Sequence, residues 1–291
     1  MKRILLPTDF SSSAWNAIEF AMKLFKDETC KFYILHTYTP ALYRLDYLLG
    51  GPNFSAIPDS EVELSIKGLE KTVRDMKRLS QNPKHQFEMV SAFNILSHEV
   101  NDQTITKNID LIVMGTKGAT GAKEVFIGSN TVYVLRKATV PVLVIPENAS
   151  LLSIKKILFP TDFLTKYKEH EFQKISEMAE RFHASIVVVH VVENYKLSEG
   201  QLKNKEHLSR LLKNIPHTFV ELTDDLMPFA IFDYLEEASI DLLAMMNKKH
   251  SLVERIFERQ HIDQVGYHVK TPFLVVQDTA KVNTKATISV D

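Results

Sequence analysis

The chain has 291 residues, of which 45% are hydrophobic, so it can bury a large core, and its length favours two domains. Its 35 basic and 36 acidic residues nearly cancel, and the formal net charge of −1 gives no support to binding of nucleic acid or of a membrane surface. The single cysteine, Cys30, excludes an intrachain disulfide and a metal site built from several cysteines.

The N-terminus, MKRILLPTDF, enters a strand-like run without an apolar signal region. No uninterrupted apolar stretch approaches the roughly 18 residues that a membrane span needs. We therefore expect a soluble, cytoplasmic protein whose partners are small molecules or proteins, with no role for nucleic acid or membrane.

Short apolar runs alternate with longer segments that carry apolar residues at helical spacing. In the first half the runs are RILLP, FYILH, FEMVSAF, LIVMG and PVLVI, and the helical segments are 12 to 25, 60 to 80, 95 to 107 and 129 to 137. This alternation predicts βαβ units and a parallel sheet with helices on both faces. An insert at 40 to 60, PALYRLDYLLGGPNFSAIPDS, interrupts the pattern and predicts a loop.

The second half repeats the first. KRILLPTDF at 2 to 10 is echoed by KKILFPTDF at 155 to 163, and IDLIVMG and VPVLVIP recur as IDLLAMM and TPFLVVQ. The matched residues are Pro7 with Pro160, Asp9 with Asp162, His36 with His190, Asp110 with Asp241 and Pro141 with Pro272. The offset falls from 153 to 131 along the chain, because the second copy lacks about the 22 residues of the insert.

The copies meet near Glu147 to Ser153, where ENASLLS has no clear period. After Gln277 the polar tail DTAKVNTKATISVD gives no sign of a regular element, and we expect it to be loosely held.

Four of the nine glycines lie in GTKGATGAKEVFIGSN at 115 to 130, directly after the apolar run LIVM. This segment is expected to join a strand to a helix at the carboxyl edge of the sheet, where such sheets bind ligands. The free N–H groups and the dipole of a helix N-terminus attract anions, and glycine lets the main chain approach a phosphate closely. Ser129, after Gly128, can donate a hydroxyl to the same anion or cap the helix.

At these residues the chain resembles a tandem universal stress protein. The ATP-binding members of this family carry the motif G-x2-G-x9-G-[S/T], and Gly115, Gly118, Gly128 and Ser129 fit it without a gap. PTDFS near the N-terminus, the strand ending ILHT and the closing PVLVI add to the resemblance. It covers about residues 1 to 146 and 154 to 277, which is nearly the whole chain.

The resemblance implies an α/β fold with two tandem Rossmann-like, doubly wound domains. Each domain would hold a five-stranded, mostly parallel sheet flanked by helices, with strand order 3-2-1-4-5. The expected domains are 1–146 with an intact nucleotide loop and 154–277 with a degenerate one, followed by the tail 278–291. In this family the final strands pair antiparallel, so PVLVIP and TPFLVVQ would join the copies into a pseudo-dimer within one chain. Whether two such chains also form a homodimer stays open.

The resemblance also implies that ATP is the ligand. Gly115, Gly118, Gly128, Ser129 and Asn130 would surround the phosphates, Asp9 would reach the ribose, Thr37 would meet the adenine through its backbone, and Pro7 and Thr8 would shape the pocket wall. Asn130 stands where other members often have a small apolar residue, but only its N–H is required. Magnesium would come with ATP, bound mostly by phosphate oxygens and water, because the histidines show no spacing for a protein-built metal site.

The second copy departs from the motif. Met246, Lys249 and Arg259 stand where the first copy has its three motif glycines, and Gln260 stands where it has the serine. These side chains would fill the volume of the phosphates, so we expect no nucleotide there in the family pose. Lys249 and Arg259 could still bind an anion through their charge.

Other interpretations stay open for three features of the first copy. Asp9 could cap the first helix, and the glycine loop could be a tight turn without a ligand. His36 is interpreted as a histidine at the edge of the core and not as a base, because no carboxylate or serine partner stands beside it in sequence.

We expect an ATP-binding stress-response protein with one competent site, which acts as a sensor or regulator with a protein partner. No catalytic residues are assigned, since no general base, arginine finger or Walker-type lysine is visible near the loop. Two alternatives are slow ATP hydrolysis at the same site and a nucleotide-free interaction module that uses the insert 40 to 60.

Overall fold

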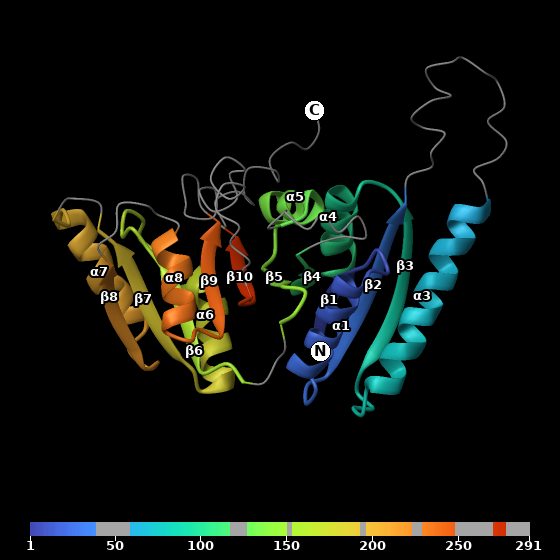
Figure 1. Cartoon of the computed structure of the whole chain (residues 1–291), viewed down its shortest axis with the longest axis horizontal. Helices are drawn as coiled ribbons and strands as arrows, with labels where there is room; N and C mark the ends of the chain where they lie inside the picture. Colours follow the sequence, from blue (N-terminus) through green and yellow to red (C-terminus); the bar gives the residue numbers. More distant parts are fainter. Residues whose placement is uncertain are drawn as a thin grey trace, which may run out of the picture. The chain divides into compact units, whose positions relative to one another are not determined.

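The computed structural model describes residues 1–38, 59–116, 127–149, 153–192, 196–222, 229–247 and 270–277. The chain divides into two compact units, Met1–Lys123 with Ile127–Val140 and Glu124–Phe126 with Pro141–Asp291. Each unit is a sheet with helices packed on it (Figure 1). Nearly all of the insert, the C-terminal tail and the middle of the glycine-rich loop lie outside the described residues.

The first sequence copy folds into strands and helices at the positions that its hydrophobic pattern predicts. In chain order the elements are β1 (Lys2–Pro7), α1 (Ser12–Leu24), β2 (Cys30–Tyr38), α3 (Asp59–Leu79), β3 (Gln86–Phe93), α4 (Leu96–Lys107), β4 (Leu111–Gly115), α5 (Ser129–Lys137) and β5 (Val142–Ile145). Local signals set their ends. Ser11 caps α1 by accepting from the N–H of Ala14 at 3.2 Å, and α4 stops at Asn108, which takes a left-handed conformation with φ of 50°.

The second copy repeats this order as far as its fourth strand, and residues 248–269, which precede its last strand, lie outside the described residues. Its elements are β6 (Lys156–Pro160), α6 (Glu169–Phe182), β7 (Ser185–Val191), α7 (Glu199–Leu211), β8 (His217–Leu222), α8 (Phe229–Glu237), β9 (Leu242–Asn247) and β10 (Phe273–Gln277). Helix α7 begins with a capping box in which Ser198 and Gln201 each bond to the other's backbone N–H.

The strand order confirms the expected fold class. It is β3-β2-β1-β4-β5 in the first copy and β8-β7-β6-β9-β10 in the second. Strand β1 runs parallel to β2 and β4, and β2 runs parallel to β3. The last strand of the first copy, β5, clusters with the second unit and pairs antiparallel with β10, so that Leu143 lies opposite Leu274. The expected pairing of the two final strands is therefore present.

Helices cover both faces of the first sheet. From β3, Ser91 Oγ lies 2.7 Å from Ser65 Oγ of α3. Glu88 is three residues away, so its side chain points to the opposite face, where it accepts from Lys107 of α4 at 2.8 Å. Helix α1 contacts α3, and α4 contacts α5. The sheet is therefore the middle of three layers.

The central strands are buried on both sides. Ile4, Leu5 and Leu6 of β1 have no exposed surface, and all five residues of β4 are buried. A parallel sheet covered on both faces needs near-continuous apolar runs, which the sequence supplies. Among the described residues, none of the helices is both apolar and long enough to cross a membrane.

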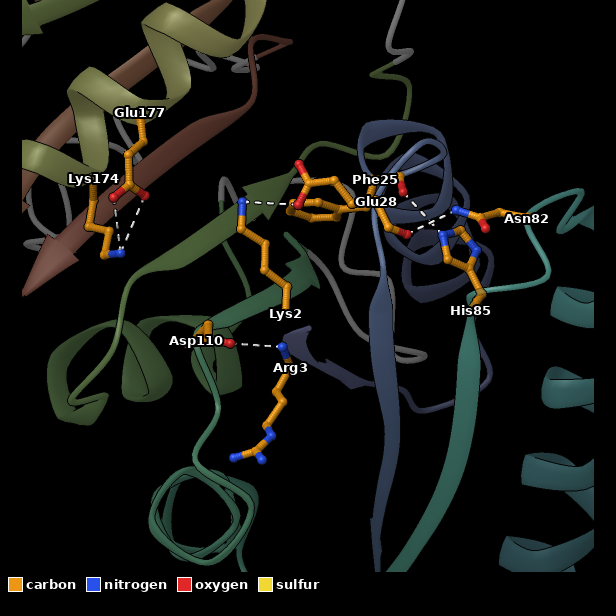
Figure 2. A network of polar contacts seen from close by, with 9 residues as sticks. All are labelled: Lys2, Arg3, Phe25, Glu28, Asn82, His85, Asp110, Lys174 and Glu177. Atoms are coloured by element: carbon orange, nitrogen blue, oxygen red, sulfur yellow. Dashed lines mark hydrogen bonds and ion pairs between the residues drawn. The ribbon is translucent and has the colours of Figure 1, made fainter.

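Polar contacts fix the amino ends of the strands (Figure 2). The carboxylate of Asp110 accepts from the backbone N–H of Arg3 at 2.8 Å. In the second copy Asp241 accepts from the N–H groups of Lys155 and Lys156 at 2.8 and 2.9 Å. This pair of repeated aspartates therefore serves the fold, at the edge opposite to the one where a ligand is expected.

The same amino edge anchors the turn that leads into β3 (Figure 2). The ring nitrogen Nε2 of His85 lies 3.1 Å from the carbonyl oxygen of Phe25, and the Asn82 amide donates to the carbonyl of Glu28 at 2.9 Å. These contacts tie the start of β3 to the end of α1.

Candidate nucleotide site at the carboxyl edge of the first sheet

The chain turns directly after β1 at the carboxyl edge. Pro7 and Thr8 are buried, and the N–H of Thr8 donates to the carbonyl of Leu35 in β2 at 2.8 Å. Asp9 is exposed, and its Oδ1 accepts from the N–H of Ser11 at 3.1 Å. Because Ser11 is the N-cap of α1, Asp9 supports the turn and does not cap the helix itself. Its carboxylate is held at the edge of the sheet, facing solvent.

Phe10 completes this turn and was missed by the sequence analysis. Its φ is 63°, and its ring stacks on His36 with the ring centroids 4.5 Å apart. Gly68 of α3 leaves room for the ring, because a Cβ at that position would collide with it. The signal was the repeated PTDF, since Phe163 takes the same conformation, with φ of 56°, in the second copy.

His36 belongs to a chain of hydroxyl contacts below the turn. Its Nδ1 lies 2.9 Å from Ser65 Oγ, which in turn contacts Ser91 Oγ. Burial lowers the pKa of His36, and the charges of Asp9 and Glu61 raise it in part. The lowered pKa favours the neutral form of the ring, which packs between β2 and α3. This agrees with the interpretation as a histidine at the core edge, although its serine partner comes from a distant part of the sequence.

Thr37 lies at the same edge of the sheet. It is half-buried on β2 and pairs in register with Ala92 of β3. Leu35, two residues earlier, is the register partner of Pro7. The backbone of Thr37 therefore continues β2 beyond the point at which β1 turns away.

Two hydrogen bonds hold the N-terminus of α5 against the end of β4. The N–H of Gly128 donates to the carbonyl of Thr116 at 2.7 Å, and the hydroxyl of Thr131 donates to the carbonyl of Gly115 at 3.0 Å. The helix N-terminus therefore has a fixed position at the carboxyl edge, beside the end of β4. Strand β4 pairs with β1, and Asp9 follows the end of β1.

Within the described residues, no hydrogen bond takes up the first N–H groups of α5. Gly128 is the N-cap and makes no side-chain cap bond. The helical ladder begins with the N–H of Val132, which donates to the carbonyl of Gly128 at 3.1 Å. Ser129 and Asn130 precede it and are exposed, so their N–H groups stand at the positive end of the helix dipole.

The first motif glycine has a packing role. A Cβ at Gly115 would lie 2.6 Å from Ser13 Oγ and 2.8 Å from Ser13 O, because the first turn of α1 approaches the end of β4. Glycine is therefore needed here whether or not a phosphate binds. The hydroxyl of Ser13 is buried and has no hydrogen-bond partner in the described part of the chain. Gly118 lies outside the described residues.

The second copy keeps the turn after its first strand. The N–H of Thr161 donates to the carbonyl of Val189 at 2.9 Å, and the N–H of Phe163 donates to Thr161 Oγ1 at 3.0 Å. The carboxylate of Asp162 accepts from the N–H of Leu164 at 2.9 Å. These bonds match those of the first copy, so the shared PTDF segment specifies a fold feature.

Side chains of the second unit itself occupy this edge. Tyr167 is buried and its hydroxyl lies 2.8 Å from Thr161 Oγ1, and burial raises its pKa well above the usual range. From α7, Gln201 donates to the carbonyl of Asp162 and Asn204 donates to the carbonyl of Phe163, both at 2.8 Å. Of the residues that replace the glycine motif, Met246 is buried in β9, and Lys249, Arg259 and Gln260 lie outside the described residues.

The geometry of the first unit defines a Rossmann-like α/β protein with a candidate anion site at its carboxyl edge. The Universal stress protein family model matches residues 1–146 and 153–277, and the chain belongs to this family in a tandem arrangement. Within the described residues, no group of three or more His, Cys, Asp or Glu could hold a metal ion.

The chain is similar to known proteins over one copy or over both. Universal stress protein MJ0577 of Methanocaldococcus jannaschii is 29% identical over 159 residues, which cover 51% of this chain and 97% of that protein. A universal stress protein from Archaeoglobus fulgidus DSM 4304 is similar over 94% of this chain and 96% of its own, with a TM-score of 0.68 and 17% identity. A universal stress protein solved in complex with cAMP covers 50% of this chain and 98% of its own, with a TM-score of 0.36 and 16% identity.

Proposed function

We propose that this protein binds ATP at a single site on the first unit and acts as a sensor or regulator in the stress response, together with a protein partner. The proposal is carried by one observation: the N-terminus of α5 is fixed against the end of β4, and no described residue bonds to its first N–H groups. Such a terminus offers N–H donors and positive potential to a phosphate. Asp9 extends from the neighbouring strand, β1, at the same edge.

The described residues that the resemblance assigns to the site each have a role in this proposal. The N–H groups of Ser129 and Asn130, with the hydroxyl of Ser129, bind phosphate oxygens, and the carboxylate of Asp9 accepts from the ribose hydroxyls. The backbone of Thr37 meets the adenine. Pro7 and Thr8 form the wall, since the N–H of Thr8 is already bonded within the sheet.

Two of the motif glycines support the site in different ways. Gly128 leaves the N-terminus of α5 without a side chain over the N–H donors, and Gly115 lets α1 approach β4. We propose that Gly118 lies against the phosphates, in the segment 117–126. Magnesium would be held by phosphate oxygens and water.

The second unit is proposed to bind no nucleotide. Tyr167 and the two amide side chains from α7 already bond to the turn that follows β6. We infer that this unit serves as a structural or regulatory partner of the first.

The test is calorimetric titration of nucleotide-stripped full-length protein with ATP and magnesium. We expect about one site per chain, as the proposal requires. Asp9→Asn should weaken binding by roughly tenfold or more, because hydrogen bonds to a charged group contribute about 1.5–3 kcal/mol. Gly128→Arg should abolish binding by placing a side chain over the donors of α5.

Asp162→Asn is the matched control, because it makes the same change in the equivalent turn of the second copy. It should leave ATP affinity and stoichiometry unchanged. Two sites per chain, or equal losses from both aspartate variants, would contradict a single site in the first unit. Absence of any heat or thermal shift with ATP would overturn the nucleotide proposal and leave the interaction module.

A further inference from the structure

The outer edge of the first sheet carries a surface that the proposed nucleotide site does not use. Strand β3 ends the strand order, and among the described residues it pairs only with β2. In the part of the chain that the structure describes, no strand pairs with the outward backbone groups of this edge, which can therefore accept another strand. Met89 and Phe93 of this strand are 46% and 45% exposed, and both point to the face on which α3 packs, because they alternate with Ser91.

A shallow groove of about 530 Å³ runs between this edge and the C-terminal half of α3. Its lining combines the apolar side chains of Val73 and Met89 with charged side chains of α3, which are Glu70, Arg74, Lys77 and Arg78. Met89 belongs to the strand edge, whereas Val73 and the charged side chains belong to the helix.

The charge of the groove is predominantly positive. Arg78 is 3.4 Å from Asp75, but in the described part of the chain no carboxylate lies within ion-pair distance of Arg74 or Lys77. Both of these residues are exposed. On the opposite face of β3 the situation differs, because Glu88 accepts from both Lys31 and Lys107. Among these described residues of β3 and its neighbours, Arg74 and Lys77 on the α3 face are thus the cations without an ion-pair partner, whereas Lys31 and Lys107 on the other face are paired.

We propose that this groove, defined by β3 and by Val73, Arg74, Lys77 and Arg78 of α3, binds an extended acidic segment of a partner protein. The segment adds to β3 as a further strand, so its backbone pairs with the open edge. Alternate side chains of an added strand point to the α3 face, where carboxylates meet Arg74 and Lys77. Main-chain pairing supplies affinity and the basic side chains supply selection for acidic sequences.

A second copy of this chain is a poorer occupant. Pairing two β3 edges about a two-fold axis would place both α3 helices on the same face and bring Arg74 and Lys77 of one copy towards those of the other. Like charges at an interface cost binding free energy, whereas an acidic segment neutralises them.

The probe is a fluorescein-labelled peptide of four Val-Asp repeats, added to the full-length protein at low salt, with a Val-Lys peptide as its counterpart. Fluorescence anisotropy should show saturable binding of the acidic peptide and at least tenfold weaker binding of the basic one. Hydrogen exchange should show protection of residues 86–93 when the acidic peptide is bound. Added salt should weaken binding, because exposed charges are screened.

The double variant Arg74→Glu/Lys77→Glu should lose at least tenfold in affinity for the acidic peptide. Both positions are exposed, so the fold should tolerate the change, which circular dichroism checks. The matched control is Lys23→Glu/Lys26→Glu, the same charge change at the groove on the amino edge. It should stay within about twofold of the unaltered chain.

Three results would overturn the proposal. The first is absence of binding up to about 1 mM acidic peptide. The second is binding of the acidic peptide without protection of β3, or an equal loss of affinity in both double variants. Either outcome would indicate a general charge effect. The third is tighter binding of polyuridylate than of the peptide with no protection of the strand, which would assign the basic residues to RNA.

Discussion

Phe10 and Phe163 adopt a left-handed backbone conformation that side chains of their size rarely take. Such a conformation persists only where the surrounding structure fixes it. In the first copy the surroundings are the His36 ring on one side and Gly68 of α3 on the other. The turn that presents Asp9 to the site therefore depends on a glycine nearly sixty residues later in the chain.

Replacing Gly68 with alanine should disturb this turn. The new Cβ would collide with the Phe10 ring, and overpacking of this kind typically costs about 1–3 kcal/mol. Urea unfolding should show the loss, and the affinity for ATP should fall because Asp9 moves. Gly200→Ala in α7 is the control, since the nearest atom to its Cβ is 3.9 Å away. A stability equal to that of the unaltered chain after Gly68→Ala would contradict this account.

His36 should make stability depend on pH. Burial lowers its pKa in the folded protein below the ordinary value of 6.5, so the unfolded chain binds the proton more readily. The contribution to stability is full above the unfolded pKa and is lost as the pH falls from there through the folded pKa. Unfolding measured between neutral and mildly acidic pH should show this loss, and His36→Gln should flatten it. An NMR titration that gives His36 a pKa above its ordinary value would contradict the prediction.

At the scale of elements, the first helix of each copy begins at a different place. Helix α1 starts at Ser12, and the repeat would start α6 at Thr165, but α6 starts at Glu169. The two copies also differ at the end of the fourth strand, where the first has Gly115 and the second has Met246. The glycine allows the first turn of α1 to approach the strand. In the second copy, where a methionine stands at this position, the helix lacks the corresponding first turn.

Gly115→Ala should therefore loosen the start of α1. Its Cβ would lie 2.6 Å from Ser13 Oγ and 2.8 Å from Ser13 O, and we expect a loss of about 1–3 kcal/mol. Hydrogen exchange of the first turn of α1 should become faster. Adding Ser13→Ala removes only the hydroxyl contact, so it should restore part of the stability. If ATP binding alone falls and stability stays constant, the glycine serves the ligand and not the packing.

At the scale of the whole molecule, the antiparallel pair β5 and β10 joins the last strands of the two copies. Leu143 and Leu274 lie opposite each other and are 1% and 2% exposed. Leu143→Ala and Leu274→Ala should each cost about 2–5 kcal/mol, and the double variant should cost less than the total of the two. Urea unfolding measures this cycle. As a control, the losses of stability from Leu143→Ala and from Ile157→Ala, on β6, should be additive. Equal coupling energies in the two double-mutant cycles would contradict the pairing of Leu143 with Leu274.

Much of this architecture could be predicted from the sequence. Runs such as RILLP and LIVMG are buried on both faces, so their apolar pattern is continuous and recognisable. The start of a helix directly after Gly128 was also predicted. The contacts of Phe10 and of Ser65 with His36 could not be predicted, because they join positions far apart in sequence and leave no local pattern. The expected roles of Gly118 and of most of the insert fall outside the described residues and stay predictions.

The amides that α7 directs to the carbonyls of Asp162 and Phe163 have a consequence for anyone who would engineer this chain. Grafting the glycine-rich loop onto the second unit would supply the motif that its sequence lacks, but side chains of Tyr167 and α7 would still occupy its edge. The side chains that bond to the turn after β6 would have to be replaced first. A second nucleotide site of the kind proposed for the first unit would therefore need changes in the second unit's own side chains as well as in its loop.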